Sequence, residues 1–414
     1  MSIPYYSMDL NAHEWRAIVK TIFSCAAFDG PFIKAYEERV KSDVGIKHML
    51  PFPSGRTGFH YLIDALFVPG DEIICSVCSF PFFIRLLHEK GIKPVFVDIE
   101  EEFCLINPDL IEGKITSKTK GILVTHLFGN PCEMDKITEI SKRNNLSLIE
   151  DCAHAYGTKY KGKPVGVFGQ AAVFSTSPMK VPTTLGGGFV VTDDDALYSS
   201  LFKALYSSEG YKFNFKKLFQ CFTFSLVYYL NSFPTIFSML ASRVFKKMRL
   251  KNPGELRKLF YSELVATKLF DPFERLRFSN LQARVGLSQL ERFDQMTQVR
   301  RRYAQIYESA FKGCQGISMI KEKPDCFNNY LYDIAVIERD QDQFVDRAIE
   351  RGLFLMDENC WYCNKYDFSK AYVQKCPVGE EKQYLLIRLP NSSLLSEKAI
   401  LQTAQIIREL VMEE

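Results

Sequence analysis

The sequence predicts an α/β fold with a mainly parallel sheet, because short apolar runs alternate with segments of helical period from about residue 57 to residue 195. Six of these runs are mainly apolar, as expected of strands buried on both faces of a sheet: Glu72–Val77, Lys93–Val97, Gly121–Thr125, Leu146–Ile149, Ala171–Phe174 and Gly188–Thr192. The segments expected to be helical include Phe82–Lys90, Pro108–Gly113 and Met134–Arg143. Ligands bind at the carboxyl ends of strands in such sheets, so polar residues directly after the runs are the first candidates for a site.

The composition is that of an ordinary globular protein, and the length of 414 residues suits two packed domains. Hydrophobic residues make up 47% and charged residues 24%, which excludes a disordered or fibrous chain. The formal net charge of +3 gives no reason to expect a nucleic-acid partner. Twelve scattered cysteines predict reduced thiols in the cytoplasm, and the first residues have neither the basic nor the apolar region of a signal peptide.

A smaller α+β domain is expected after the sheet. Apolar side chains recur every three or four residues from Leu287 to Ile306, which predicts one long amphipathic helix that bridges two domains. Beyond it, the pattern predicts two strands and two helices, at Tyr330–Ile337, Gln343–Arg351, Tyr384–Leu389 and Ser396–Val411, with Ser396 as the N-cap of the last helix. We therefore divide the chain into a large domain, residues 1–295, and a small domain, residues 296–414.

Two chemically active side chains follow predicted strands. Asp151 comes just after the run Leu146–Ile149 and is placed to face a ligand, although a capping aspartate followed by a core histidine, His154, would give the same pattern. Lys180 lies between two buried strands, where desolvation lowers the pKa of an amine and makes it a usable nucleophile; the alternative is a lysine that extends to solvent. The glycines at 186–188 either bring the backbone close to a ligand or serve a tight bend.

A third candidate is the segment Pro53–His60, which opens a predicted helix at Thr57–Leu66. Its hydroxyls and free backbone amides suit an anion, and Arg56 adds a charged donor, although such helix starts are common. Its glycine spacing is neither that of nucleoside triphosphatases nor that of dinucleotide-binding proteins, so ATP and NAD are not expected. A phosphate cradle, an aspartate at a strand end and a lysine about thirty residues later together describe a pocket for pyridoxal phosphate (PLP).

Further motifs accompany this pocket along the chain: Pro-Ser-Gly-Arg-Thr-Gly at 53–58, Pro69–Ile74, Ser79-Phe80, Pro94–Asp98, His126–Pro131, Glu150–Gly157, Phe174-Ser175 with Lys180 and Gly187-Gly188, and Gln282-Ala283 with Gly286 and Gln289–Arg292. With them the chain closely resembles the sugar aminotransferases of the DegT/StrS type, which are fold-type I enzymes dependent on PLP. The resemblance runs from about Gly30 to Leu389, apart from one insertion. It implies a mainly parallel seven-stranded sheet in a large domain and a smaller α+β C-terminal domain.

The resemblance also implies a role for each matching residue. Lys180 would form a Schiff base with PLP, and Asp151 would pair with the pyridinium nitrogen. The other residues that would contact the cofactor are Phe80, stacked on the ring, His154, near the ring hydroxyl, and Arg56, Thr57 and Ser175, around the phosphate.

Two arginines correspond to the family's Asn-x-Arg signature. Arg277 matches its arginine, and Arg275 stands where its asparagine usually reaches the phosphate of the neighbouring subunit. An arginine still suits a phosphate, so the resemblance implies a homodimer with a shared active site.

The implied activity is the transfer of an amino group from an amino acid, with glutamate expected, to a keto-sugar linked to a nucleotide, for surface polysaccharide or amino-sugar biosynthesis. Retention of Lys180 favours transamination, because sugar dehydratases among the relatives replace this lysine with histidine. Two departures bear on the substrate: the family's Gly-Thr-Ala is Gly55-Arg56-Thr57 here, and Leu185–Gly188 lacks the family's glutamate. The alternatives are a PLP-dependent sugar dehydratase and a catalytically silent relative that acts as a sensor or a membrane-associated scaffold.

Two CxxC pairs, Cys75/Cys78 and Cys360/Cys363, have the spacing of zinc or iron–sulfur ligands. They fall in different predicted domains, and Cys75 belongs to a predicted buried strand. We therefore interpret these cysteines as core residues and expect no metal.

An insertion at about residues 211–256 interrupts the family pattern. Residues 218–242 carry no charge and are long enough to span a bilayer, but eight of them are Gln, Thr, Ser or Asn and Pro234 interrupts the run, which disfavours a spanning helix. Lysines and arginines flank the run. One interpretation is therefore a peripheral contact of residues 215–250 with an anionic membrane, at the inner face; the other is a pair of helices packed on the catalytic domain or on the dimer partner.

Overall fold

The computed structural model describes residues 3–4, 9–24, 26–206, 277–329, 333–358, 362–366, 369, 372 and 374–413, together with the single residues 219, 223, 226, 230 and 236. Arg275, Cys360 and nearly all of the insertion at 211–256 lie outside these residues. Within the described part of the chain, no helix is both long and apolar enough to cross a membrane.

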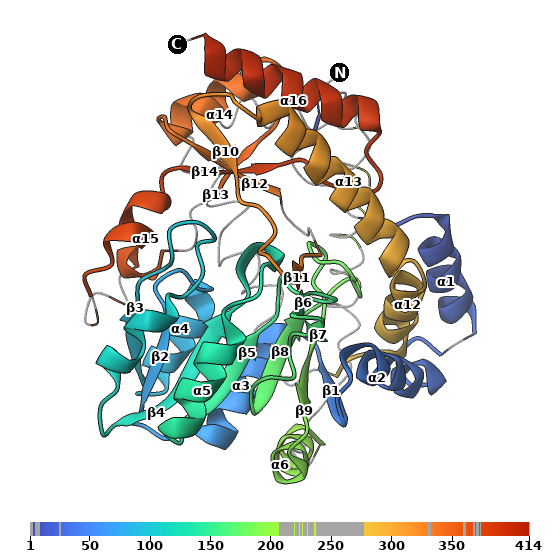
Figure 1. Ribbon diagram of the computed structural model, residues 1–414. Coiled ribbons are helices and arrows are strands. Elements are labelled where there is room, and N and C mark those ends of the chain that lie inside the picture. Colours follow the sequence, from blue (N-terminus) through green and yellow to red (C-terminus); the bar gives the residue numbers. More distant parts are fainter. Residues whose placement is uncertain are drawn as a thin grey trace.

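A seven-stranded sheet forms the centre of the larger part of the molecule (Figure 1). Its strands, in spatial order, are β1 (His48–Phe52), β9 (Gly188–Thr192), β8 (Ala171–Ser175), β5 (Ser147–Asp151), β4 (Thr119–Thr125), β2 (Glu72–Ser76) and β3 (Lys93–Val97). The five strands from β8 to β3 run parallel to one another, and β9 is antiparallel to both of its neighbours. The predicted mainly parallel sheet of seven strands is confirmed, and all six predicted runs form strands in it.

Helices bury both faces of this sheet. In β8, Val173 belongs to the same hydrophobic core as Phe59 and Leu62, whereas its neighbour Phe174 packs in a separate core with Tyr36 and Val40. Successive residues of a strand point to opposite faces, so both faces are covered, as the apolar runs predict. The helices of this part are α1 (Ala12–Phe23), α2 (Pro31–Val44), α3 (Gly55–Leu66), α4 (Pro81–Glu89), α5 (Met134–Arg143), α6 (Asp195–Tyr206) and α12 (Asn280–Glu291).

A second, antiparallel sheet follows in the C-terminal part, with the order β10 (Ile317–Met319), β12 (Asp333–Ile337), β14 (Leu386–Leu389) and β13 (Met356–Glu358). Three helices, α13 (Phe293–Phe311), α14 (Gln341–Glu350) and α16 (Glu397–Met412), share a core with this sheet. The predicted N-cap is confirmed, since the Ser396 hydroxyl accepts from the Ala399 N–H at 3.3 Å. We keep the boundary near residue 295 as a proposal.

Short elements connect the two parts. The helix α15 (Pro377–Lys382) and the 3₁₀ turn η5 (Cys363–Lys365) lie between β13 and β14 in sequence. A small sheet joins β11 (Cys326–Phe327) to β6 (Lys159–Tyr160) and β7 (Lys163–Pro164), so a segment just before β12 returns to the loops of the large sheet.

Two predicted helices are wrong in detail. The long helix is instead two helices, because Arg292 leaves helical geometry (φ −112°, ψ 1°) and its guanidinium bonds both carboxylate oxygens of Glu14 at 2.7 Å. Segment 108–113 forms two 3₁₀ turns, η1 (Pro108–Leu110) and η2 (Glu112–Lys114), rather than an α-helix. Six residues with a glycine among them are too few to stabilise a longer helix.

Candidate active site

Asp151 is the last residue of β5, at the carboxyl edge of three neighbouring parallel strands. Its side chain is 1% exposed and accepts a hydrogen bond from the Ala153 N–H at 3.0 Å and another from the Thr125 hydroxyl. The Thr125 hydroxyl lies 3.1 Å from that of Ser79, which follows β2. The ends of β2, β4 and β5 therefore converge on one buried carboxyl group, as expected for a ligand site in an open parallel sheet.

Burial raises the pKa of Asp151 to about 6, although the Ala153 N–H and the charge of Lys180 both act to lower it. A carboxylate in this position is costly for the fold when ionised, and a nearby positive charge reduces that cost. The site is therefore suited to a ligand that brings a positive charge to the end of β5.

Lys180 lies in the loop that joins β8 to β9. The loop is closed on itself by backbone bonds, among them Lys180 N–H to Ser177 O at 2.9 Å and Thr176 N–H to Gly187 O at 3.0 Å. Lys180 is half-buried, and its charge acts on both Asp151 and His154. The structure thus places the predicted nucleophile within electrostatic reach of the predicted ring partner.

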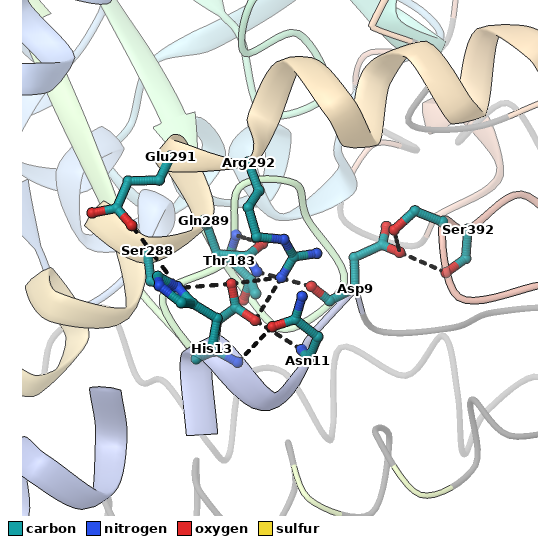
Figure 2. A network of polar contacts seen from close by, with 11 residues as sticks. Asp9, Asn11, His13, Thr183, Ser288, Gln289, Glu291, Arg292 and Ser392 are labelled. Atoms are coloured by element: carbon teal, nitrogen blue, oxygen red, sulfur yellow. Dashed lines mark hydrogen bonds and ion pairs between the residues drawn. The ribbon is translucent and has the colours of Figure 1, made fainter. Parts of the chain in front are cut away.

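The N-terminal segment fastens this loop to the rest of the molecule, as Figure 2 shows. The Gln289 side chain accepts from the Thr183 N–H at 3.4 Å and donates to the Asp9 carbonyl at 2.8 Å. Asp9 is buried in an ion pair with Arg300 and also accepts from the Ser392 hydroxyl at 2.7 Å. Burial alone would raise the pKa of Asp9, but the Arg300 charge and these hydrogen bonds outweigh it and lower the pKa. The lysine loop is thereby connected to α12, to α13 and to the segment that follows β14.

The segment predicted to bind an anion forms the N-terminus of α3. Ser54 caps the helix, accepting from the Thr57 N–H at 3.1 Å, and the buried guanidinium of Arg56 lies 5.4 Å from the centre of the Phe82 ring. A helix start with free amides, a hydroxyl and a guanidinium attracts a phosphate group.

The glycines after Lys180 have a packing role at this helix start. A Cβ on Gly188 would lie 2.3 Å from the Gly55 nitrogen, so only glycine lets β9 approach α3 this closely. A Cβ on Gly55 would in turn lie 3.5 Å from the Cα of Ser175. Gly188 therefore allows a close approach of the protein backbone to itself, between β9 and α3. This packing also brings Ser175 next to the start of α3.

Two further predicted residues lie on the ring side of the site. Phe80 caps the start of α4, is half-buried, and packs edge-to-face on Phe83 with ring centres 5.4 Å apart. His154 is buried, and its Nδ1 accepts from the Phe128 N–H at 3.4 Å. Burial, followed by the charges of Lys180 and Arg388, holds the pKa of His154 well below its usual value, so the imidazole is neutral.

Of the two arginines matched to the family signature, the structure describes only one, Arg277. Arg275 lies outside the described residues, so its contact with a partner subunit stays a prediction. Arg277 is half-buried, and its guanidinium lies 5.5 Å from the centre of the Tyr206 ring, at the end of α6.

Two polar residues of the site, Thr125 and Arg388, were not predicted from the sequence. Thr125 ends β4 and could have been found as the polar last residue of the predicted run Gly121–Thr125. Arg388 is 3% exposed and lies in β14, far along the chain from the other residues. Its signal was a single charged residue inside an otherwise apolar predicted strand.

One group in the described part of the chain could offer three ligands to a metal: His126, Glu150 and Cys152, whose ligand atoms lie within 4.8 Å of one another. His126 Nδ1 accepts from the Cys132 N–H at 3.1 Å, so Nε2 carries the proton and donates to Glu150 at 3.1 Å. The Glu150 oxygens also accept three backbone N–H bonds at 2.8 Å, from Gly166, Phe168 and Gly169. We interpret this group as a hydrogen-bonded network that supports the backbone next to Asp151. The absence of a metal stays a prediction.

Comparison with known proteins gives concordant results. The model of the DegT/DnrJ/EryC1/StrS aminotransferase family matches residues 9–221 and 246–408. A GDP-perosamine synthase of Escherichia coli O157:H7 is 27% identical over 424 aligned positions, which cover 100% of this chain and 99% of that protein. A GDP-perosamine synthase of Vibrio cholerae is 26% identical over 341 positions, covering 82% of this chain and 78% of the relative.

Solved structures share the fold. The aminotransferase TlmJ from Streptoalloteichus hindustanus matches with a TM-score of 0.79 and 19% identity, over 99% of both chains. Helicobacter pylori PseC, an aminotransferase involved in the biosynthesis of pseudoaminic acid, matches with a TM-score of 0.78 and 20% identity, over 100% of both chains. These similarities confirm the predicted fold class.

Proposed function

Because the chain belongs to the DegT/DnrJ/EryC1/StrS aminotransferase family, which depends on pyridoxal phosphate, we propose that it transfers the amino group of an amino acid to a keto-sugar linked to a nucleotide. Glutamate is the donor we expect, and surface polysaccharide or amino-sugar biosynthesis is the expected use of the product. The two relatives named GDP-perosamine synthase support a nucleotide-linked sugar, because that name describes a product linked to GDP.

The observation that carries the proposal is the lysine that acts electrostatically on a buried carboxyl group at the carboxyl edge of the sheet. Three features of the described residues fit PLP there. Asp151 suits a protonated ring nitrogen, the start of α3 suits a phosphate, and Lys180 can bond to an aldehyde. When bound, the cofactor supplies an electron-accepting ring that carries the amino group between the two substrates.

The chain's own residues would then divide the work. Asp151 holds a proton on the ring nitrogen, and the cost of burying its charge falls once that cation is present. Arg56 and Thr57 fix the phosphate, so that the ring cannot slide away from Asp151. Lys180 would hold the aldehyde of the cofactor, and its freed amine would move a proton between the substrate carbon that bears the nitrogen and the cofactor carbon on the other side of that nitrogen.

Arg388 supports a donor that carries a carboxylate. Along β14, Ile387 and Leu389 lie in the core beneath α13, α14 and α16, whereas Leu386 lies in the core of the large sheet. Side chains two residues apart in a strand share a face, so Arg388 faces the large sheet together with Leu386. Its charge also reaches His154. A buried guanidinium on that side of the site is suited to a bidentate bond with a carboxylate.

The proposal is tested by incubating the purified protein with PLP, glutamate and a panel of nucleotide-linked keto-sugars, and by measuring 2-oxoglutarate. We expect 2-oxoglutarate and an aminated sugar with at least one substrate, and neither with Lys180→Ala. A dehydrated keto-sugar without consumption of glutamate would indicate a dehydratase, and failure to bind PLP would indicate a silent relative. Either result would overturn the proposal.

Arg388→Gln tests the donor site. Loss of a charged hydrogen-bond pair costs about 1.5–3 kcal/mol, so kcat/KM for the amino acid should fall roughly 10- to 150-fold. The KM for the sugar should stay near the wild-type value. A donor analogue that lacks the carboxylate should react equally with both proteins; an equal loss for this analogue would exclude a carboxylate contact.

A further inference from the structure

Two adjacent buried asparagines, Asn328 and Asn329, reach from the segment before β12 back into the loops of the large sheet. We call this pair the asparagine clamp. The Asn329 amide nitrogen donates to the carbonyl oxygen of His154 at 2.8 Å and to that of Tyr156 at 3.0 Å. The Asn328 amide nitrogen donates to the carbonyl of Phe128 at 3.3 Å and to the Asn130 side chain at 3.1 Å. The clamp therefore holds both loops that meet at the His154 ring.

The loop that carries His154 begins directly after Asp151, and His154 is its third residue. Its own turns are closed by the bonds Ala155 N–H to Cys152 O at 2.9 Å and Thr158 N–H to Ala155 O at 3.1 Å. Neither of these bonds involves His154 itself. The two bonds from Asn329 add to these turns, because they fix the carbonyls of His154 and Tyr156, on both sides of Ala155.

The asparagine clamp packs tightly against the loop that contains Phe128 and Gly129. Gly129 has φ +80°, and a Cβ there would lie 2.3 Å from the Asn328 side-chain oxygen and 2.5 Å from that of Asn329. Any larger residue at 129 would displace both amides. Gly129 ends the 3₁₀ turn η3 (Leu127–Gly129), which contains Phe128, whose N–H bonds His154.

We propose that Asn329 is a positioning residue: its amide holds the His154 loop so that the imidazole keeps a fixed place beside the PLP ring, without touching cofactor or substrate itself. This inference rests on the proposed function for the role of His154 at the ring. The choice of residue follows from hydrogen-bond chemistry. Two neighbouring carbonyl oxygens require two N–H donors from one uncharged group, and a primary amide nitrogen supplies both. An aspartate at this position would place its carboxylate oxygens against the two carbonyl oxygens, with no donor between them. A serine would supply only one donor.

The test compares Asn329→Ala with Asn391→Ala. Asn391 is also a buried asparagine, and its amide nitrogen donates to the Asp333 carboxylate at 2.7 Å, within the C-terminal part. The first readout is the titration of the His154 imidazole by NMR in protein without cofactor. Among the six histidines its signal is identified by its loss in His154→Gln. The second readout is the dissociation constant of PLP.

In Asn329→Ala we expect the imidazole to gain contact with water and its pKa to rise by about one unit or more, while PLP binds roughly tenfold more weakly. Asn391→Ala should lower the stability of the fold but leave both readouts at the wild-type values. If Asn329→Ala does not fold, Asn329→Ser, which keeps one donor, should give a smaller shift in the same direction.

Wild-type values of both readouts in the Asn329 variants would overturn the proposal, and so would equal shifts in Asn391→Ala, since those would follow from destabilisation alone. The titration is measured without PLP. A protein that binds no cofactor would therefore refute the proposed function and still leave the clamp testable.

Discussion

Replacing Asp151 with asparagine should make the protein without cofactor more stable and the enzyme inactive. The carboxyl group is fully buried, and burial raises its pKa from 3.8 to about 6. In the unfolded chain it loses its proton near pH 3.8, so between about pH 4 and pH 6 the folded state holds more protons than the unfolded state. Stability therefore falls as the pH rises through this window and stays lower above it.

The size of the effect follows from the shift. About 2 pKa units correspond to about 3 kcal/mol of lost stability at pH 8, and to about half of that at pH 5, where the folded carboxyl group is still largely protonated. Asparagine has no charge to bury and escapes this loss. Without the carboxylate, however, no group holds the proton on the ring nitrogen, so turnover should be lost.

The assay is urea denaturation of wild type and Asp151→Asn at pH 5, 6.5 and 8, without PLP. The stability difference in favour of the variant should grow by about 1.5 kcal/mol from pH 5 to pH 8. Asp98→Asn is the matched control: the oxygens of this buried aspartate accept backbone N–H bonds from Val378 and Gly379 at 3.0 and 2.9 Å, so its loss should destabilise the fold. A difference for Asp151→Asn that does not change with pH would refute the reasoning.

Two further substitutions test the packing around the site. Gly188→Ala places a Cβ 2.3 Å from the Gly55 nitrogen, so it should lower the free energy of unfolding by about 1–3 kcal/mol in thermal denaturation and weaken PLP binding. Gly113→Ala is the control and should be neutral, because no atom lies within 4 Å of its Cβ. Equal stability of the two variants would contradict the proposed contact. Arg300→Met leaves the buried carboxylate of Asp9 without its cation and should cost about 3–5 kcal/mol in urea denaturation. The double variant with Asp9→Leu should recover most of that loss, and a double variant no more stable than Arg300→Met would show that the ion pair is not the cause.

The sequence predicted the large sheet well because a strand buried on both faces has little freedom in its composition. Lys93–Val97 and Gly188–Thr192 were predicted with the bounds that the structure has. The break of the long helix at Arg292 was not predictable, since the apolar period continues through it and the Glu14 carboxylate that binds the Arg292 guanidinium is distant in sequence. The short strands β6, β7 and β11 were missed for the same reason, because two-residue strands exist only through their partners.

The candidate site shows the same division. Asp151 ends β5, and Lys180 and the start of α3 lie in the segments that follow β8 and β1, so position along the chain was enough to find them. Thr125 and Arg388 act through neighbours that only the folded chain supplies: Thr125 through the adjacent end of β5, and Arg388 through the face that β14 turns to the large sheet. The membrane contact of residues 215–250 and the homodimer stay predictions.

The central claim is that Lys180 bonds to PLP beside Asp151. The most direct measurement is borohydride reduction of the protein loaded with PLP, followed by proteolysis and mass spectrometry. We predict that the reduced cofactor is found on the peptide containing Lys180 and that Lys180→Ala carries none. Label on a different lysine, or bound cofactor that borohydride never fixes to the wild-type chain, would contradict the account.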